Sequence, residues 1–326
     1  MADLSEKILL LSGVPVGCRQ VPFSQNFYAM LNEAMTLNQT ERHCLHSVTF
    51  LRRKLIVAIY DQHMHTLYSF DSEAQLRDYL AQTKAPVVTT EHLEFDNPDD
   101  GGRDDLPDYA GMVRTQAALA TNYHNELLLG IEAGYFAPAE PRLRDYLAHH
   151  DFDLTLLSFH HDGKHDYLDT QIATLPPKQV LTDYFSRMLT GIQRFHDADV
   201  LAHFDYGVRQ FELTPEQLEA WGKAALDQIF AIAVDHDLAL ELNTKSMYKW
   251  HNAPLYDLAI TWYQAAGGHL FTIGSDAHEG PHYEANFAQA LAMLKRHGVK
   301  EIATYRHHKR TMVPIEPPVT DANNVY

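Results

Sequence analysis

The sequence predicts an α/β protein in which short parallel strands alternate with helices and close into a barrel. From about residue 55 onward, short stretches rich in Val, Ile and Leu alternate with longer amphipathic segments. The apolar stretches lack polar alternation, as is typical of strands that are buried on both faces. Repeated strand and helix units give a parallel sheet, and in a chain of 326 residues such a sheet usually closes into a barrel.

The predicted strands are five to seven residues long, and the last of them is the weakest. They lie at residues 55–60, 86–90, 127–132, 153–159, 200–204, 238–243, 270–276 and 301–305.

Three of the intervening segments carry recognisable helix signals. The clearest helix begins at Pro215, with Thr214 as its N-cap and Gln217 at the third position to complete a capping box. Residues 183–196 and 284–297 also have helical spacing, and Gly298 follows the second of them as a C-cap.

The first 54 residues do not follow this pattern. We therefore expect two parts, a small and mostly helical N-terminal extension over residues 1–54 and the barrel over residues 55–326. No feature of the extension indicates its role.

Composition excludes several classes of function. A formal charge of −17 argues against binding a nucleic-acid backbone. No run of about 18 apolar residues could span a membrane, and the acidic N-terminus does not resemble a signal peptide. Cys18 and Cys44 cannot form a disulfide framework, so we expect a cytoplasmic protein.

Metal-binding side chains follow six of the first seven predicted strands. Because parallel strands of a barrel end at the same rim, these side chains are expected to meet there. They are His63, His65, Asp71, His92, Glu132, His160, His203, Asp276 and His278.

The recurrence of these residues at the strand ends favours a metal site over the alternative that each is merely packed in the core or exposed to solvent. Residues two apart in a strand point to the same face, so His63 can act with His65, and Asp276 with His278. Imidazoles and carboxylates at the ends of buried strands are costly unless they are paired or metal-bound. Imidazole and carboxylate suit zinc, iron or manganese, and no thiolate is present. His161 is expected to face outward.

These same residues resemble the motifs of the PHP (polymerase and histidinol phosphatase) family. The resemblance runs from HMHTLYSFD at residues 63–71 through TEH, GIE, SFH and HFD to GSDAH at residues 274–278. It covers roughly residues 58–315, and the flanking text is similar to the histidinol-phosphate phosphatase branch. The first 54 residues lie outside this pattern.

The resemblance implies a distorted seven-stranded, TIM-like (β/α)7 barrel with three divalent transition-metal ions, either zinc, iron or manganese. It implies one metal bound by His63, His65, Glu132 and Asp276. Glu132 bridges to a second metal, held by His160 and His203, and Asp71, His92 and His278 bind the third.

The resemblance also implies a phosphomonoesterase of histidine biosynthesis that converts L-histidinol phosphate to L-histidinol and phosphate. A metal-bridging hydroxide would attack phosphorus, and the metals would neutralise charge on the phosphate oxygens. The expected partner is thus a small phosphate ester; the oligomeric state is not indicated. Arg209 is the candidate phosphate-binding residue, although it lies about one position from where the family pattern places such a residue, and Lys164 and Lys245 are weaker candidates.

Three alternatives stay open. An amidohydrolase barrel also begins with His-x-His, but it tends to have a lysine at the fourth strand, where this chain has His160. A phosphodiesterase, a nuclease or a phosphatase for another small ester would keep the same metal ligands. A non-catalytic PHP module would have lost ligands, and none is missing here.

Overall fold

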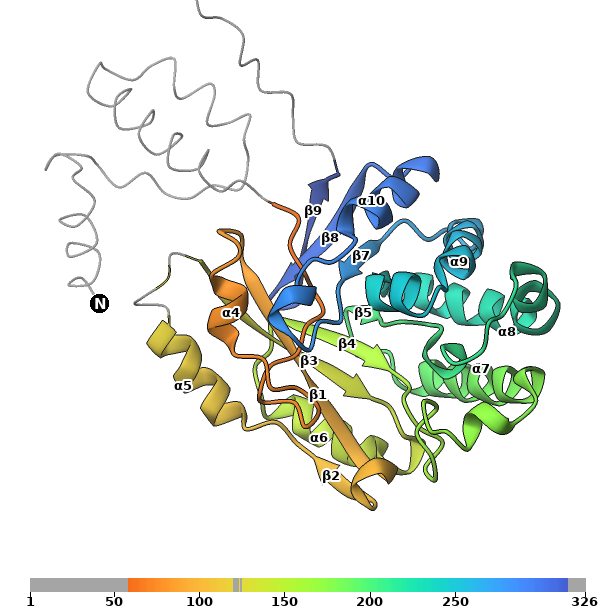
Figure 1. Ribbon diagram of the computed structural model, residues 1–326, viewed down its shortest axis with the longest axis horizontal. Coiled ribbons are helices and arrows are strands. Elements are labelled where there is room, and N and C mark those ends of the chain that lie inside the picture. The colour runs from red at the N-terminus through yellow and green to blue at the C-terminus, as the bar shows by residue number, and fades with distance from the viewer. Residues whose placement is uncertain (1–57, 120–122, 124, 316–326) are drawn as a thin grey trace, which may run out of the picture. The chain divides into compact units, whose positions relative to one another are not determined.

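The computed structural model of the chain describes residues 58–119, 123 and 125–315 (Figure 1). The predicted extension over residues 1–54 and its boundary therefore lie outside the described residues. The helices are α4 (Leu76–Leu80), α5 (Tyr109–Leu119), α6 (Glu140–Ala148), α7 (Pro177–Arg194), α8 (Pro215–Asp235), α9 (Ala253–Ala265) and α10 (Phe287–Arg296). The strands are β1 (Val87–Asn97), β2 (Arg103–Asp105), β3 (Leu127–Gly134), β4 (Leu154–Ser158), β5 (Val200–Leu201), β6 (Ala239–Asn243), β7 (Phe271–Gly274), β8 (Glu301–Arg306) and β9 (Lys309–Pro314).

The central sheet runs in the order β2-β1-β3-β4-β5-β6-β7. All neighbours from β1 to β7 are parallel, and β2 is an antiparallel strand at the edge. Residues 61–65 close the ring between β7 and β1. On one side the N–H of Gln62 donates to the carbonyl of Ile273 at 3.2 Å, and on the other the N–H of Thr90 donates to the carbonyl of Met64 at 2.8 Å. The predicted α/β barrel is confirmed.

Two of the predicted strands differ from expectation. Residues 58–60 of the first predicted strand are not in a strand, and pairing with the barrel begins at Gln62, two residues beyond its predicted end. The weakest predicted strand does form, as β8, but it pairs with β9 in an antiparallel hairpin rather than with the barrel. A strand of an exposed hairpin usually alternates between buried and exposed residues. Strand β8 does not, because its residues 302–305 are all buried.

The predicted helix at Pro215 is confirmed, including the capping box between Thr214 and Gln217. Helix α7 begins at Pro177, earlier than predicted, because a proline at the first turn starts it. Helix α10 begins only at Phe287, since Glu284 and Asn286 have positive φ angles of 53° and 61°.

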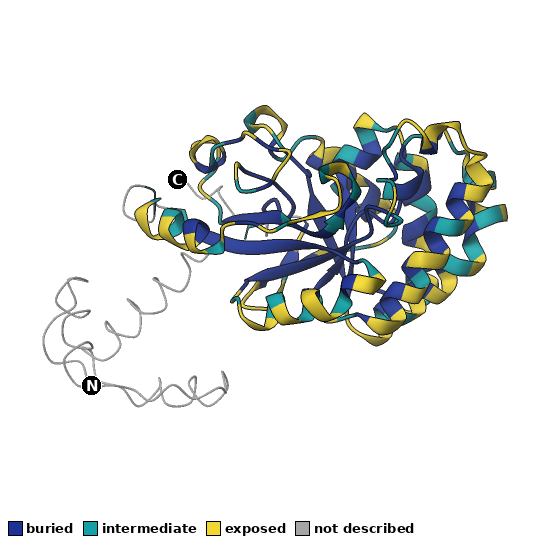
Figure 2. Ribbon diagram, turned by 90° about the horizontal axis from the view of Figure 1, so that it is seen from below, coloured by how far each residue is buried: buried dark blue, intermediate teal, exposed yellow. Residues whose placement is uncertain are grey.

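The interior of the barrel has an apolar end and a polar end. At one end, inward-facing side chains such as Val88, Leu128 and Leu156 pack with Ala303 and Tyr305 of the β8–β9 hairpin. A larger apolar layer lies between the strands and the surrounding helices, whose outer surfaces are exposed (Figure 2). The hairpin thus fills the N-terminal end of the barrel and leaves the C-terminal ends of the strands for polar residues.

Candidate metal centre

Glu132 lies at the centre of a buried cluster of imidazoles. It faces the barrel interior from β3, beside its register partner His92 on β1. Its Oε2 atom lies 3.3 Å from Nε2 of His63, 3.4 Å from Nε2 of His65 and 3.0 Å from Nδ1 of His92. Its Oε1 atom lies 3.0 Å from Nε2 of His160 and 2.6 Å from Nε2 of His203. Both oxygens of this one carboxylate therefore face ring nitrogens.

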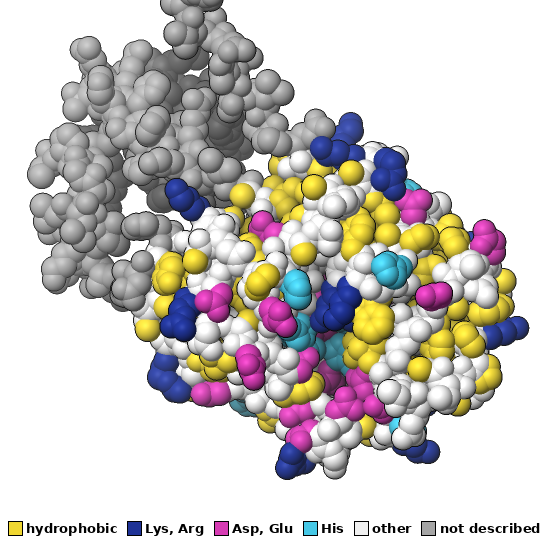
Figure 3. Space-filling model, in the orientation of Figure 1, with side chains coloured by type: hydrophobic (Ala, Val, Ile, Leu, Met, Phe, Trp, Pro, Cys, Tyr) yellow, Lys and Arg dark blue, Asp and Glu magenta, His cyan; other side chains and the backbone are white. Residues whose placement is uncertain are grey.

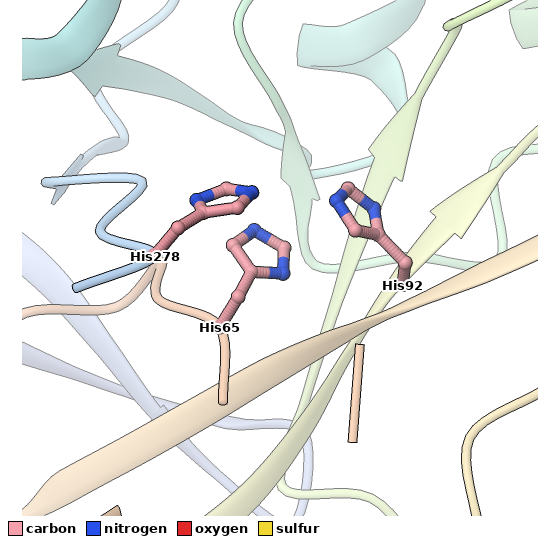
Figure 4. A group of neighbouring side chains, drawn as sticks. All are labelled: His65, His92 and His278. Atoms are coloured by element: carbon pink, nitrogen blue, oxygen red, sulfur yellow. The ribbon is translucent and has the colours of Figure 1, made fainter. Parts of the chain in front are cut away.

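A second group lies on the outer side of this cluster, where three imidazoles from separate parts of the chain face one another (Figure 4). The ring of His65 lies 4.2 Å from that of His92 and 4.3 Å from that of His278, measured between centroids. Asp71 completes the group, because its Oδ2 atom lies 2.9 Å from Nε2 of His278 and its Oδ1 atom 3.5 Å from Nε2 of His92.

Asp276 joins the cluster from the segment after β7, where its φ of 51° turns the chain back toward His63. Its Oδ1 atom lies 3.7 Å from Nε2 of His65 and accepts a 3.0 Å hydrogen bond from Nζ of Lys245. Its Oδ2 atom accepts from Nη2 of Arg209 at 3.1 Å and from Nδ2 of Asn243 at 3.2 Å. Asp276 therefore contacts a cation through each of its oxygens, Lys245 through the oxygen that also faces the histidines and Arg209 through the other.

A second layer of carboxylates fixes the orientation of the histidines. Nδ1 of His63 donates to Glu241 at 2.6 Å, and Nδ1 of His160 donates to Glu94. Glu241 also accepts from the backbone N–H of His203 at 2.7 Å. Because the rings of His63 and His160 use Nδ1 in this way, their Nε2 atoms face Glu132 and are the atoms left for a metal ion, which is the usual arrangement of metal-binding histidines.

The buried polar atoms of this cluster fit divalent metal ions. Oε2 of Glu132, Nδ1 of His92 and Nδ1 of His203 are buried, and none of them makes a hydrogen bond of good geometry among the described residues, although the first two atoms lie 3.0 Å apart. Ligand atoms come within 4.8 Å of one another in four overlapping groups of three, which draw on all the predicted ligands except Asp71. Nitrogen and carboxylate donors suit zinc, iron or manganese. The structure thus brings together a set of ligands that can bind metal.

The electrostatics of the cluster agree with this fit. Burial disfavours the charged form of Glu132, but His63 and His160 hold its pKa well below the usual range. Burial, and then His92 and His278, lower the pKa of His65 well below its usual value, so this ring is neutral. Burial also opposes the charged form of His63, but Glu241 and Glu132 raise its pKa well above the usual value. A bound metal ion would replace the ring protons of these histidines as the positive partner of Glu132.

All nine predicted ligands lie in or against this cluster. Arg209 is buried, with 3% of its surface exposed, and hydrogen-bonds Ser246, Asn243 and Asp276 through Nε and Nη2. Lys164 is exposed on the loop after β4. The outward orientation expected for His161 is wrong, because it is buried with Nε2 3.6 Å from Oε2 of Glu94.

The second layer was not predicted, although the period of a strand could have found part of it. Glu94 follows His92 by two positions in β1, so both point into the barrel. Glu241 and Asn243 have the same spacing in β6. Two sequence features could therefore have predicted this layer. One is a carboxylate two residues from a candidate histidine ligand, and the other is a pair of polar residues two apart in a buried strand.

Histidine and acidic side chains gather with one another near the middle of the face in Figure 3. The sequence profile of the PHP domain matches residues 61–245, more than half of the chain. This chain belongs to the PHP domain family. The match contains the segment 61–65 and strands β1 to β6, and with them seven of the nine predicted ligands.

Several relatives of this PHP protein carry names that describe their activity. The histidinol-phosphatase of Lactococcus lactis is 24% identical over 253 residues, covering 75% of this chain and 93% of the relative. A protein named "Probable histidinol-phosphatase" from Thermotoga maritima is 27% identical over 250 residues, covering 74% and 94%. One of that name from Clostridium acetobutylicum is 26% identical over 251 residues, covering 75% and 96%.

The fold is also shared with a solved structure. The crystal structure of histidinol phosphate phosphatase from Lactococcus lactis, complexed with zinc, L-histidinol and phosphate, covers 77% of this chain and 98% of its own. The TM-score is 0.68 at 22% sequence identity, which establishes a common fold. Among the residues that the structure of this chain describes, none of the helices is long and apolar enough to cross a membrane.

Proposed function

We propose that this PHP protein is a metal-dependent phosphomonoesterase that hydrolyses L-histidinol phosphate to L-histidinol and phosphate. The observation that carries the proposal is the position of Glu132, whose two carboxylate oxygens lie within 3.4 Å of ring nitrogens of five histidines. The names of the relatives support the substrate. A phosphate ester also suits the site electrostatically, since bound divalent cations exceed the charge of three carboxylates.

The proposed cofactors are three divalent transition-metal ions, with zinc, iron or manganese as candidates. His63, His65, Glu132 and Asp276 would hold one ion, and three of them already have ligand atoms within 4.8 Å of one another. The second and third sets would be Glu132 with His160 and His203, and Asp71 with His92 and His278. The 2.9 Å contact between Asp71 and His278 supports the third set.

When bound, the metals would acidify a water molecule and neutralise charge on the phosphate oxygens. The chain's own contribution is orientation. Glu241 and Glu94 keep Nε2 of His63 and His160 directed at the centre, and Arg209 and Asn243 hold one oxygen of Asp276. Lys245, with its side chain 22% exposed, is a cation available to phosphate oxygens. Arg209 can contribute Nη1, which makes none of the hydrogen bonds described above.

One assay panel tests the proposal. Purified enzyme should hydrolyse L-histidinol phosphate much faster than p-nitrophenyl phosphate and should leave bis(p-nitrophenyl) phosphate intact, and EDTA should abolish hydrolysis. A preference for the diester would place the chain among phosphodiesterases. Metal-independent hydrolysis, or none of any phosphate ester, would refute the proposal.

A further inference from the structure

A carboxylate outside the ligand set lies beside the metal centre. The loop after β4 folds back on itself, so that the N–H of Tyr167 donates to the carbonyl of His160 at 2.9 Å, and the backbones of His161 and Asp166 form an isolated antiparallel β-bridge. Tyr206 connects this carboxylate to the centre. Its ring lies 4.6 Å from that of His160 and 5.2 Å from that of His203, and its hydroxyl lies 3.0 Å and 3.1 Å from the two oxygens of Asp166.

Asp166 has no basic partner within 4 Å among the described residues. Burial raises its pKa to about 6, and the nearby charge of Asp99 adds to this effect, while His160 opposes it. Among the described residues it accepts hydrogen bonds from the hydroxyl of Tyr206 and from the N–H of Leu168, which is 2.6 Å away. A carboxylate has about four acceptor sites, so there is room for a further donor.

The charged groups are divided across the centre. On one side, Lys245 contacts Asp276 and His278. On the other, beyond His160 and His203, is the unpaired Asp166. Arg209 lies 4.9 Å from the ring of Tyr206, but its hydrogen bonds go to Ser246, Asn243 and Asp276. A substrate with a phosphate at one end and a cation at the other would match this division.

We propose that Asp166 binds the ammonium group of an aminoalkyl phosphate substrate and that Tyr206 is the positioning residue that holds this carboxylate. The inference rests on the proposed phosphomonoesterase activity and extends it to the specificity of the site. Asp166 is half-buried. A carboxylate that is partly removed from water and has no nearby cation is unfavourable, and a bound ammonium would supply both a charge and hydrogen-bond donors. Asp166 would then select amino-bearing esters without taking part in the hydrolysis itself.

The test compares L-histidinol phosphate with 3-(imidazol-4-yl)propyl phosphate, in which a hydrogen atom replaces the amino group. We expect Asp166→Asn to raise KM for L-histidinol phosphate by about tenfold or more, as for loss of a charged hydrogen bond. KM for the des-amino ester and kcat for both should change less than about threefold. Asp166→Glu should keep part of the preference. An unchanged ratio of kcat/KM for the two esters in Asp166→Asn would overturn the proposal.

Asp169→Asn is the matched control, because it removes the same charge from the same loop, and the hydrogen bonds that Asp169 makes among the described residues use only its backbone. It should leave the ratio unchanged; an equal loss of preference would contradict a specific role for Asp166. Tyr206→Phe should raise KM for the amino ester more than for the des-amino ester, whereas a merely structural role would lower kcat for both alike. If Asp166→Asn does not fold, Asp166→Glu and Tyr206→Phe decide the question in the same way.

Failure of the proposed function is distinguishable from failure of this inference. If the wild-type enzyme does not hydrolyse L-histidinol phosphate, the same variants are compared on 2-aminoethyl phosphate and ethyl phosphate. A preference for the amine that disappears in Asp166→Asn would still support the role of Asp166. Equal hydrolysis of the two simple esters by the wild-type enzyme would refute it.

Discussion

Nδ1 of His63 lies 2.6 Å from Oε1 of Glu241, and both side chains are buried inside the barrel. Glu241 is not among the predicted ligands, but it fixes which nitrogen of His63 faces Glu132. We therefore expect Glu241→Gln to lower metal affinity and kcat by about 10- to 100-fold while the chain stays folded. Elemental analysis and steady-state kinetics would measure this. Glu219→Gln, at an exposed position of α8, is the control and should have no effect.

Gly134 provides the space for the carboxylate that orients His160. A Cβ atom at this position would lie 2.0 Å from Oε1 of Glu94. In Gly134→Ala the flexible end of Glu94 has to move, so its bond to His160 should be lost. We expect roughly tenfold lower activity with a smaller change in thermal stability. Wild-type activity in this variant would show that the Glu94 contact does not orient His160.

Arg209 and Lys245 differ in burial, and this should separate their effects. Arg209→Ala should raise KM for phosphomonoesters and weaken inhibition by phosphate. It should also lower Tm, because it removes a buried partner of Asp276. Lys245→Ala should raise KM by about tenfold with little change in Tm, since this side chain is partly exposed. Unchanged KM and phosphate inhibition in both variants would exclude a phosphate-binding role.

At the opposite end of the barrel, Nδ1 of His308 lies 2.8 Å from Oδ2 of Asp199. This hydrogen bond raises the pKa of His308 above its usual value. The contribution to stability is therefore fully present below the unfolded pKa of about 6.5 and is lost as the pH rises through the folded pKa. Because the side chain is 52% exposed, the effect should be small.

His308→Asn should consequently lower Tm more at pH 6 than at pH 9, as measured by thermal unfolding. The same substitution at exposed His282 is the control and should show no such pH dependence. A loss of Tm in His308→Asn that grows with pH would contradict the proposed sign.

The residues of the cluster around Glu132 were predictable because their signal is local in sequence. Each follows an apolar strand, and the parallel barrel then brings the strand ends together without further information. The predicted strands at residues 200–204 and 238–243 overlap β5 and β6 for the same reason. The resemblance to PHP motifs added the order of the ligands and the expected reaction.

The parts that could not be predicted depend on tertiary contacts. Strand β8 pairs with β9 in a hairpin that buries the apolar end of the barrel, where Ala303 and Tyr305 pack. The burial of Arg209 follows from its bonds to Asn243 and Asp276, which lie 34 and 67 positions away in sequence. Local spacing in the sequence does not predict contacts between residues so far apart in the chain.

The central claim is that Glu132 bridges metals that hydrolyse a phosphomonoester, and elemental analysis combined with activity measures it most directly. The wild-type enzyme should contain about three transition-metal ions per chain and lose hydrolysis of L-histidinol phosphate in EDTA. Glu132→Gln should lose more metal and more activity than His278→Asn, since it removes a bridge and a negative charge together. Enzyme that contains no stoichiometric metal and remains fully active in EDTA would contradict the account.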